Sequence, residues 1–525
     1  MEEARFERWW RALVVAWAAL HVFTLFGELP EPDAALYASI ARWVAVTGNW
    51  ADLLAYNIPW LDKPHFPFWT MAASFKVFGV SVWAARLPAL ACFFLGVWAT
   101  WRLGLELFSR RVAQVAVLVV FSAQHLVMSN ADTRAEPWLV GLLTCAVWLT
   151  VRVARAKERW VRALVVASAC TAAAMMTKGP FVLIPVASVA VIPSLLKREP
   201  VRWGRWALAV LLVAVFITPE LWALWSQFEG RGVRWFLWDS QFGRFTNTGP
   251  IRGRGDPTFF FHTVLWAFLP WSLLLYAAVV SWVRRRAWRA NETVAWVAAL
   301  PLGLVFTLSR FQLPHYLNVL FPFFALGVAA WLVDQKPRVF GVQAVVVGGT
   351  ALFVGVLLVM FGVPGALAIA AALVLGVLFS LRLRDAVLVS ALGSLLINVA
   401  YEGVFVPATL RYQVGGAAAE LANGLPPRRT AMLDLSSHAF AFHLHERAEW
   451  WSEVELRGEL PKMPVRLLIR RARLDELQPA LGLEVTVLGE WDSFPATTPT
   501  LAFLDAARRP GVVDHWVLAD VQLAR

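Results

Sequence analysis

Two apolar runs decide the class of this fold: residues 339–361, VFGVQAVVVGGTALFVGVLLVMF, and residues 365–381, GALAIAAALVLGVLFSL. Neither run contains a charged residue. A helix of about 20 predominantly apolar residues spans the hydrocarbon core of a bilayer. The two runs therefore predict consecutive transmembrane helices.

The rest of the chain extends this pattern. Of its 525 residues, 59% are hydrophobic and 16% are charged, whereas soluble domains carry roughly 25% charged residues. This composition excludes a soluble enzyme, a disordered chain and a disulfide scaffold, and it predicts a polytopic α-helical membrane protein. We predict thirteen spans, near residues 8–26, 86–108, 112–129, 136–153, 161–177, 180–196, 206–226, 257–282, 293–309, 314–333, 339–361, 365–381 and 385–404.

Alternate short loops between these spans are rich in arginine and lysine. Loops of this kind remain in the cytoplasm. With thirteen spans, the alternation predicts a cytoplasmic N-terminus and an extracytoplasmic C-terminus. The basic groups are Arg5/Arg8/Arg11, Arg110/Arg111, Arg152/Arg155/Lys157/Arg159, Lys197/Arg198/Arg202/Arg205, Arg284/Arg285/Arg286/Arg289, Lys336/Arg338 and Arg382/Arg384.

Two of the predicted outer loops are long, at about 27–85 and 227–256. The first contains two amphipathic stretches, 34–48 and 64–78, whose apolar residues fall on one helical face. Helices of this kind lie in the plane of the membrane interface. We therefore expect two juxtamembrane helices in the first outer loop.

From about residue 405 the composition becomes that of a soluble domain. Residues 405–525 hold 13 Lys/Arg against 15 Asp/Glu, whereas residues 1–404 hold 35 against 21. Short apolar runs alternating with helical stretches predict a small α/β domain after the 1–404 membrane domain. The predicted strands are 431–435, 465–469, 484–488, 500–504 and 515–519, and the predicted helices are 415–424, 437–446 and 473–481. Its four histidines, His438, His443, His445 and His515, are interpreted as surface residues rather than metal ligands.

The three cysteines, Cys92, Cys145 and Cys170, each lie in an apolar run. Their spacing matches no metal site, so we expect packed or lipid-facing thiols. The chain also contains no phosphate-binding motif of the Walker or dinucleotide type. Neither feature predicts a cofactor.

Carboxylates of the membrane part gather near the outer ends of the spans, where an acidic residue is costly and therefore a functional candidate. Asp33 follows the first span in E-L-P-E-P-D-A-A-L-Y (28–37), at the start of the first amphipathic helix. It could cap that helix. It could instead orient or deprotonate an acceptor at the membrane surface.

Three outer cations are candidates for binding a phosphate. Lys63 lies in L-D-K-P-H-F, Lys178 in M-T-K-G-P, and Arg244 in D-S-Q-F-G-R-F. Together they would form a positive cup that stabilises a phosphate leaving group during glycosyl transfer. For Lys63 the alternative is an interfacial lysine that merely reaches toward water.

The order of these motifs over residues 20–330 resembles the bacterial transferases that move 4-amino-4-deoxy-L-arabinose from undecaprenyl phosphate to lipid A. With the protein O-mannosyltransferases, these belong to the class C integral membrane glycosyltransferases. The resemblance is carried by P-D-A-A-L-Y-A-S-I-A (32–41), D-K-P (62–64), F-G-V-S-V-W-A-A-R-L-P-A-L (78–90), T-K-G-P (177–180), R-F (244–245), L-P-W (269–271) and L-P-H-Y (313–316).

The resemblance implies a class C fold with thirteen transmembrane helices, an extracytoplasmic C-terminal domain and an inverting mechanism. The donor would be a polyprenyl-phosphate sugar, and the acceptor lipid A, an envelope glycan or a protein. The chain itself would lie in the bacterial inner membrane. Asp33 matches the catalytic aspartate of the first loop, and Glu136 matches a second acidic residue, with Asp132 as a rival. Lys63 and Arg244 match the donor-phosphate contacts, and we assign Lys178, Tyr37, His315 and Tyr316 to the same donor-binding group.

The resemblance also suggests a divalent metal ion near Asp62 and Asp239, where the family usually has Glu and His. Other positions depart from the family pattern. Ala34 and Leu36 stand where the family has Glu and Arg after P-D, and Gln312 replaces a lysine. These losses of charge leave the sugar and the acceptor open.

Two further classes of function compete with a transferase. A transporter or flippase of a lipid-linked sugar would have internal repeats and charges at mid-membrane, but here the charges lie at the outer ends. A non-catalytic membrane scaffold would use the soluble domain to bind a partner. In that case Asp33 and Lys63 would be replaceable.

Overall fold

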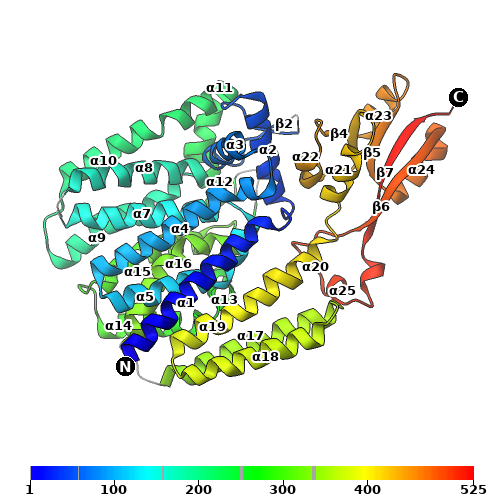
Figure 1. Ribbon diagram of the computed structural model, residues 1–525. Coiled ribbons are helices and arrows are strands. Elements are labelled where there is room, and N and C mark those ends of the chain that lie inside the picture. Colours follow the sequence, from blue (N-terminus) through cyan, green and yellow to red (C-terminus); the bar gives the residue numbers. More distant parts are fainter. Residues whose placement is uncertain (1, 57, 156–158, 249–251, 334–337, 525) are drawn as a thin grey trace.

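The computed structural model describes residues 2–56, 58–155, 159–248, 252–333 and 338–524, without the side chains of residues 2, 244, 245 and 338. A helical bundle occupies most of the chain, and a smaller domain built on a sheet lies against one end of it (Figure 1). We call this the domain end of the bundle. The N-terminus lies at the opposite end (Figure 1).

The bundle begins with the helices that come before the break at residues 156–158. These are α1 (Glu2–Phe23), α2 (Asp33–Thr47), α3 (Phe66–Phe78), α4 (Val82–Leu107), α5 (Arg110–Ser122), α6 (Gln124–Asp132) and α7 (Glu136–Ala154). It continues with α8 (Trp160–Lys178), α9 (Leu183–Lys197), α10 (Trp203–Phe216), α11 (Thr218–Arg234), α12 (Ser240–Thr246), α13 (Phe259–Ala267), α14 (Ser272–Arg285) and α15 (Glu292–Leu308). The last members are α16 (Phe321–Val333), α17 (Arg338–Met360), α18 (Ala366–Ser380), α19 (Ala386–Ala400) and α20 (Val406–Leu410).

Most of the predicted spans are present. In the described part of the chain, 9 helices are long and apolar enough to cross a membrane, and two bent pairs, α5–α6 and α10–α11, raise the number to 11. Helix α15 is apolar but shorter. The chain is a multi-span membrane protein, and the predicted class of fold is confirmed.

The predicted span 257–282 is wrong as a single helix. The chain forms α13 and α14 there, with a turn between them that contains Pro270. Proline has no backbone N–H and interrupts a helix. The turn is fixed in the bundle by the fully buried Trp271, whose indole Nε1 donates to Ser122 Oγ at 2.9 Å.

Helix α7 lies at the centre of the bundle and is buried along nearly its whole length. It packs against α4 and α8. A Cβ atom at Gly141 would lie 2.0 Å from the carbonyl oxygen of Cys92 on α4. Small residues let membrane helices approach this closely, so Gly141 sets the α4–α7 separation.

The two helices predicted in the first long loop are α2 and α3, which pack on each other. Helix α2 is buried over more than the single face that its pattern predicts. Ala34, Ala35, Ala38 and Ala41 are buried together with the larger apolar residues of α2, which are Leu36, Tyr37, Ile40 and Val44. The additional burial arises because α2 also contacts the C-terminal domain.

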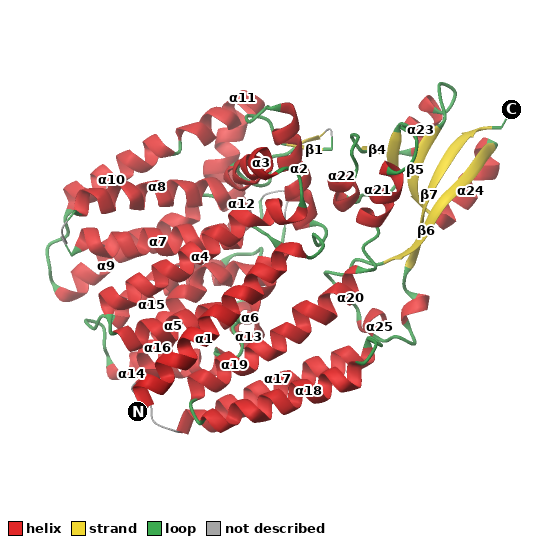
Figure 2. Ribbon diagram, in the orientation of Figure 1, coloured by secondary structure: helices red, strands yellow, loops and turns green. Residues whose placement is uncertain are grey.

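The C-terminal domain is a mixed sheet covered by helices on both faces (Figure 2). The strand order is β4-β3-β5-β7-β6, with β4, β3 and β5 parallel and β7 antiparallel to both β5 and β6. The strands are β3 (Thr430–Leu433), β4 (Glu449–Trp451), β5 (Val465–Arg470), β6 (Leu483–Ser493) and β7 (Asp514–Leu523). A separate hairpin in the first loop pairs β1 (Leu54–Ala55) with β2 (Ile58–Pro59).

Alternate strand residues of this sheet point to opposite faces, as the pleat requires. On one face Leu467 and Val517 pack with Leu474 and Leu477 of α24. On the other face Leu468 and Leu518 belong to a second core with residues of α21 and α22. The helices of the domain are α21 (Gly415–Asn423), α22 (His438–His443), α23 (Glu453–Glu459), α24 (Arg471–Leu481) and α25 (Leu501–Leu504).

Three details of this domain differ from expectation. The predicted strand 500–504 is the short helix α25, which Thr500 caps and whose Phe503 stacks on Phe494 at 4.0 Å. Strand β4 was missed because its E-W-W sequence forms no apolar run. His438 and His443 are not free surface residues, since both are partly buried.

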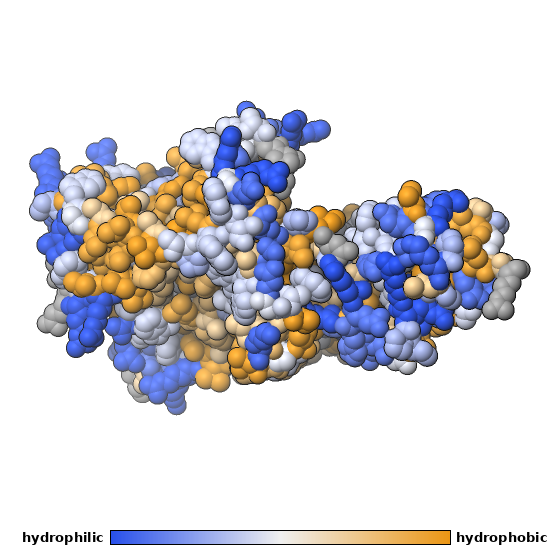
Figure 3. Space-filling model, turned by 90° about the horizontal axis from the view of Figure 1, so that it is seen from above, coloured by the Kyte–Doolittle hydropathy of each residue, from blue (hydrophilic) through white to orange (hydrophobic). Residues whose placement is uncertain are grey.

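Figure 3 shows broad hydrophobic areas on the bundle, whereas hydrophilic side chains gather on the C-terminal domain and at the opposite end of the molecule. Large apolar side chains remain exposed on the bundle, among them Trp222 and Trp225 on α11. Broad exposed apolar areas on a protein mark an interaction surface. The composition of the chain identifies that surface as the one that contacts lipid.

Substituting Gly141 by alanine should lower stability, because the added methyl group would overlap the backbone of α4. Overpacking of this kind costs about 1–3 kcal/mol. The change would be measured as a lower melting temperature in detergent. Gly348→Ala on α17 is the matched control, since no atom lies within 4 Å of its Cβ position. Equal melting temperatures for the two variants would contradict the assigned packing.

Candidate active site

A charged cavity of about 190 Å³ lies at the domain end of the bundle. It collects residues from α2, from the segment before α3, from the start of α7, from the end of α8 and from the segment before α16. Eight of the site residues proposed from the sequence line it. The lining residues are Asp33, Tyr37, Asp62, Lys63, Arg134, Ala135, Glu136, Lys178, Phe311, Leu313, His315 and Tyr316.

The helix termini explain why charges gather in this cavity. Glu136 is the first residue of α7 and Lys178 is the last residue of α8, and the two helices pack together. A carboxylate is favoured at a helix N-terminus and a cation at a C-terminus. Asp33 is likewise the first residue of α2. The membrane helices therefore present their charged ends to one space.

Lys178 and Glu136 form a buried ion pair, with side chains 8% and 2% exposed. His315 Nε2 lies 3.7 Å from Glu136 Oε1, and Lys178 Nζ lies 4.5 Å from the centre of the Tyr316 ring. A buried carboxylate requires such compensation, because removing a charge from water is costly. Glu136 is therefore held in place by its cationic partner.

Arg134 is the residue of this site that sequence analysis missed. It forms an ion pair with Asp132, its Nε lies 3.4 Å from Asp33 Oδ2, and its NH1 lies 3.2 Å from His315 Nδ1. Burial alone would lower the pKa of Arg134, but Asp132, Asp33 and Glu136 raise it above its ordinary value. The available signal was its place in D-T-R-A-E-P, between two predicted acids.

The three candidate carboxylates have different surroundings. Asp132 binds Arg134 and is absent from the lining of the cavity, and Glu136 is buried against Lys178. The side chain of Asp33 lines the cavity and is 39% exposed. Of these three, Asp33 is the carboxylate that an incoming group can reach most easily.

Tyr37 lies one helical turn after Asp33 and is buried in the cavity wall. Burial, and then the negative charge of Asp33, raise the pKa of Tyr37 well above its ordinary value. Its phenol therefore stays protonated. It can donate a hydrogen bond into the cavity.

Lys63 is 19% exposed and forms an ion pair with its neighbour Asp62. Of the predicted positive cup, the structure brings Lys63 and Lys178 into one cavity. Arg244 belongs to α12, but its side chain lies outside the described residues.

The predicted metal site receives no support from the side chains that would form it. Asp62 is paired with Lys63, and Asp239 lies 3.3 Å from Arg234 Nε. Within the described ranges no three His, Cys, Asp or Glu residues are grouped as a metal site would require. Two carboxylates that each neutralise a cation do not fit a divalent ion, so no step is assigned to a metal here.

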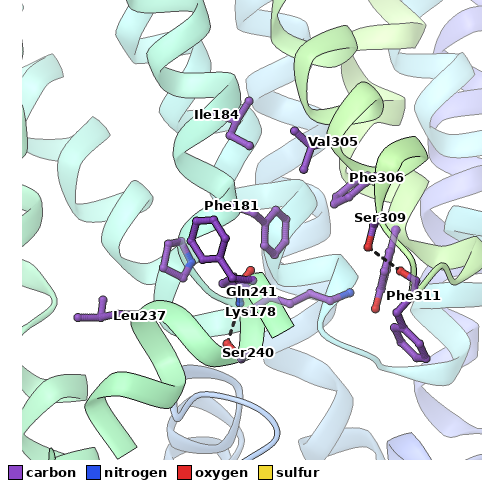
Figure 4. Close-up of a pocket in the computed structure, with 13 residues that line it drawn as sticks. Lys178, Phe181, Ile184, Leu237, Ser240, Gln241, Val305, Phe306, Ser309 and Phe311 are labelled. Atoms are coloured by element: carbon purple, nitrogen blue, oxygen red, sulfur yellow. Dashed lines mark hydrogen bonds between the residues drawn. The ribbon is translucent and has the colours of Figure 1, made fainter. Parts of the chain in front are cut away.

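An apolar cavity of about 420 Å³ adjoins the charged one. The two cavities share Lys178, Phe311 and Tyr316. In Figure 4 the Lys178 side chain extends past apolar side chains such as Phe181 and Phe306, and Gln241 and Ser240 line the near side. The adjoining spaces could hold a molecule with one anionic end and one long hydrocarbon end.

Sequence comparisons relate the chain to enzymes that use polyprenyl phosphates. Residues 62–223 match the family described as dolichyl-phosphate-mannose-protein mannosyltransferase. An undecaprenyl phosphate-alpha-4-amino-4-deoxy-L-arabinose arabinosyl transferase of Pseudomonas fluorescens is 28% identical over 63% of this chain and 60% of the relative. One from Proteus mirabilis is 27% identical over 62% of this chain and 59% of the relative. The matches thus span about 60% of the length of these relatives.

Comparison with solved structures extends over the whole molecule. The crystal structure of ArnT from Cupriavidus metallidurans bound to undecaprenyl phosphate matches with a TM-score of 0.79 and 19% identity, covering 97% of this chain and 98% of that chain. Its apo form matches with a TM-score of 0.76. The likeness shows a shared fold, and the resemblance predicted from the sequence motifs is confirmed.

Removing one partner of the Lys178–Glu136 pair should destabilise the protein. Lys178→Met leaves a buried carboxylate without its main compensation, a change that costs about 3–5 kcal/mol in buried pairs. The double variant Glu136→Gln, Lys178→Met removes both charges and should recover most of the loss in melting temperature. A double variant that melts lower than Lys178→Met would contradict this account.

Proposed function

We propose that this chain, which has the class C glycosyltransferase fold and resembles the bacterial arabinosyl transferases, is an integral membrane glycosyltransferase. It moves a sugar from undecaprenyl phosphate or a related polyprenyl phosphate to lipid A or another envelope acceptor. One observation carries the proposal. A reachable carboxylate, Asp33, shares a cavity with Lys63 and Lys178, and that cavity opens onto a large apolar one.

The adjoining cavities support a lipid-linked donor. The apolar cavity offers Phe181, Phe306 and Ile184 to a prenyl chain. Lys178 lines both cavities, so its ammonium lies where the phosphate of such a lipid would lie. Lys63, in the segment before α3, lines the charged cavity together with Lys178. An ammonium is a strong donor to phosphate oxygens.

The reaction follows as a single displacement at the anomeric carbon. Asp33 accepts the proton of the acceptor hydroxyl. At the same time the hydroxyl oxygen of the acceptor forms a bond to the anomeric carbon. The bond from the anomeric carbon to the phosphate oxygen breaks, and polyprenyl phosphate leaves with the electron pair. Lys63 and Lys178 stabilise the negative charge that develops on the phosphate. General base catalysis of this kind contributes about 10²–10⁴-fold.

Two departures from the family pattern, at Leu36 and Gln312, put uncharged side chains where the family has cations. Leu36 stands where the family has arginine, and it is buried. Gln312 stands where the family has lysine, and its amide donates to the carbonyl oxygens of Asp256 and Thr307. Arg134 provides a guanidinium beside Asp33. We infer that this altered set of charges selects a sugar or an acceptor different from that of enzymes with the full pattern.

We also propose the orientation that the basic loops predict, with the charged cavity and the C-terminal domain outside the cytoplasm of a bacterial inner membrane. In a variant whose native cysteines are replaced, a thiol at the exposed Val454 should react with a membrane-impermeant maleimide in intact spheroplasts. A thiol at Ala290, in an arginine-rich loop at the other end of the bundle, should react only after permeabilisation. The reverse pattern would contradict the orientation.

Asp33→Asn tests the mechanism. In the structure Pro32, not Asp33, is the N-cap residue of α2, and no side-chain capping hydrogen bond is formed there. Asparagine keeps the shape of the side chain, so a purely structural role predicts little loss. The catalytic role predicts a fall of about 100-fold or more in transfer of labelled sugar from a polyprenyl phosphate. The assay uses purified protein in detergent.

Asp52→Asn is the matched control, since Asp52 lies in the same loop, outside the cavity, and accepts a hydrogen bond from Asn49. Its turnover should equal that of the wild type. Wild-type turnover of Asp33→Asn would remove Asp33 from the mechanism. Movement of the labelled lipid across vesicles without sugar transfer by the wild type would favour a flippase.

A further inference from the structure

The residue two positions before Asp33 is held by three separate segments of the C-terminal part of the chain. The backbone N–H of Glu31 donates to Gln413 Oε1 at 2.7 Å, and its carbonyl accepts from Thr497 Oγ1 at 2.6 Å. Its carboxylate accepts from Ser437 Oγ at 2.6 Å and from the backbone N–H of Ala439 at 2.7 Å. Backbone and side chain of one loop residue are thus all bound by the C-terminal part.

Arg42, farther along α2, makes the complementary contacts. Its guanidinium donates to carbonyl oxygens where α22 ends, with distances of 2.8 Å to Phe442 and 2.9 Å to His445. Ala441 and Leu444 offer two more carbonyl oxygens to the same group. Arg42 therefore binds the C-terminal end of α22, while Glu31 binds its N-terminal end.

The charges of these two residues suit the two ends of α22. The first N–H groups and the last C=O groups of a helix have no partner within the helix, and in a helix of six residues such groups predominate. A carboxylate is favoured at the first end and a cation at the second. We call Glu31, Arg42 and the two ends of α22 the α2 clamp.

We propose that the α2 clamp positions Asp33 for the transfer reaction, so that Glu31 and Arg42 are positioning residues and the C-terminal domain is part of the catalytic framework. This inference rests on the proposed function of Asp33. Asp33 is the first residue of α2, and the clamp fixes both the segment leading into this helix and the helix itself. A displacement of about 1 Å in a reacting group can cost about 100-fold in rate.

Glu31→Ala and Glu31→Gln together test the proposal. Alanine removes both side-chain hydrogen bonds, and we expect kcat to fall about 10-fold to 100-fold with the donor KM little changed. Glutamine keeps an oxygen that can accept from Ser437 and Ala439, so the two hydrogen bonds remain and kcat should return to within about threefold of the wild type. If Glu31 were itself the proton acceptor, glutamine would be as inactive as alanine.

Ser437→Ala removes the partner of the same contact and is the second variant should Glu31→Ala fail to fold. The double variant should be no worse than the poorer single variant, because residues in one contact are not additive. Arg447→Ala is the control, because Arg447 also lies where the C-terminal domain meets the bundle. Arg447 donates to Tyr56 O at 3.0 Å and lies 4.4 Å from the Trp43 ring, but it does not bind Glu31, Arg42 or α22. Its kcat should equal that of the wild type.

Amide hydrogen exchange over residues 33–41 provides a readout that does not depend on activity. Exchange should be faster in Glu31→Ala and Ser437→Ala, and unchanged in Arg447→Ala. Wild-type kcat and wild-type exchange in Glu31→Ala would overturn the clamp, while an inactive Asp33→Asn would leave the proposed function intact. If exchange is faster in Glu31→Ala but Asp33→Asn keeps full activity, Asp33 has no role in the reaction. The positioning role of the clamp is then overturned with it.

Discussion

The buried ion pair between Lys178 and Glu136 is the constraint on which the rest of the site depends. It joins the end of α8 to the start of α7, the helix at the centre of the bundle. A charge in this position is tolerated only with a partner, so the pair holds the start of α7 against the end of α8. Asp33, Lys63 and Arg134 gather around the same point from other elements.

The arrangement separates the tasks of the three carboxylates. Glu136 compensates Lys178 and Asp132 compensates Arg134, whereas Asp33 remains open to the cavity. The same arrangement puts Lys178 at the boundary between a charged space and an apolar one. A lipid phosphate has these two characters in one molecule. In the proposed function, these two neighbouring spaces are what would let the chain recognise a lipid-linked donor without a nucleotide-binding motif.

The C-terminal domain is connected to this site through α2 rather than through the cavity itself. Helix α22 meets Glu31 and Arg42, and Phe442 lies near Phe75 of α3, with ring centres 6.0 Å apart. Tyr56 of the first loop stacks on His438 at 5.1 Å. Burial lowers the pKa of His438 to about 4, so this ring is neutral near pH 7 and packs as an aromatic group. His438, which was predicted to lie free on the surface, thus packs where the C-terminal domain meets the first loop.

The class of the fold, the order of the spans and most of the cavity's charged lining could be predicted from the amino-acid sequence alone. Long apolar runs can satisfy their backbone in a membrane only as helices, and charged motifs at their ends mark the few places where polar groups are tolerated. Asp33, Glu136 and Lys178 could therefore be identified one by one. Which of these charges meet could not be predicted in this way. Arg134 meets Asp33 and His315, and α22 meets Glu31 and Arg42, although these residues lie far apart in the chain. No local pattern encodes such distances, because they follow from how the helices pack.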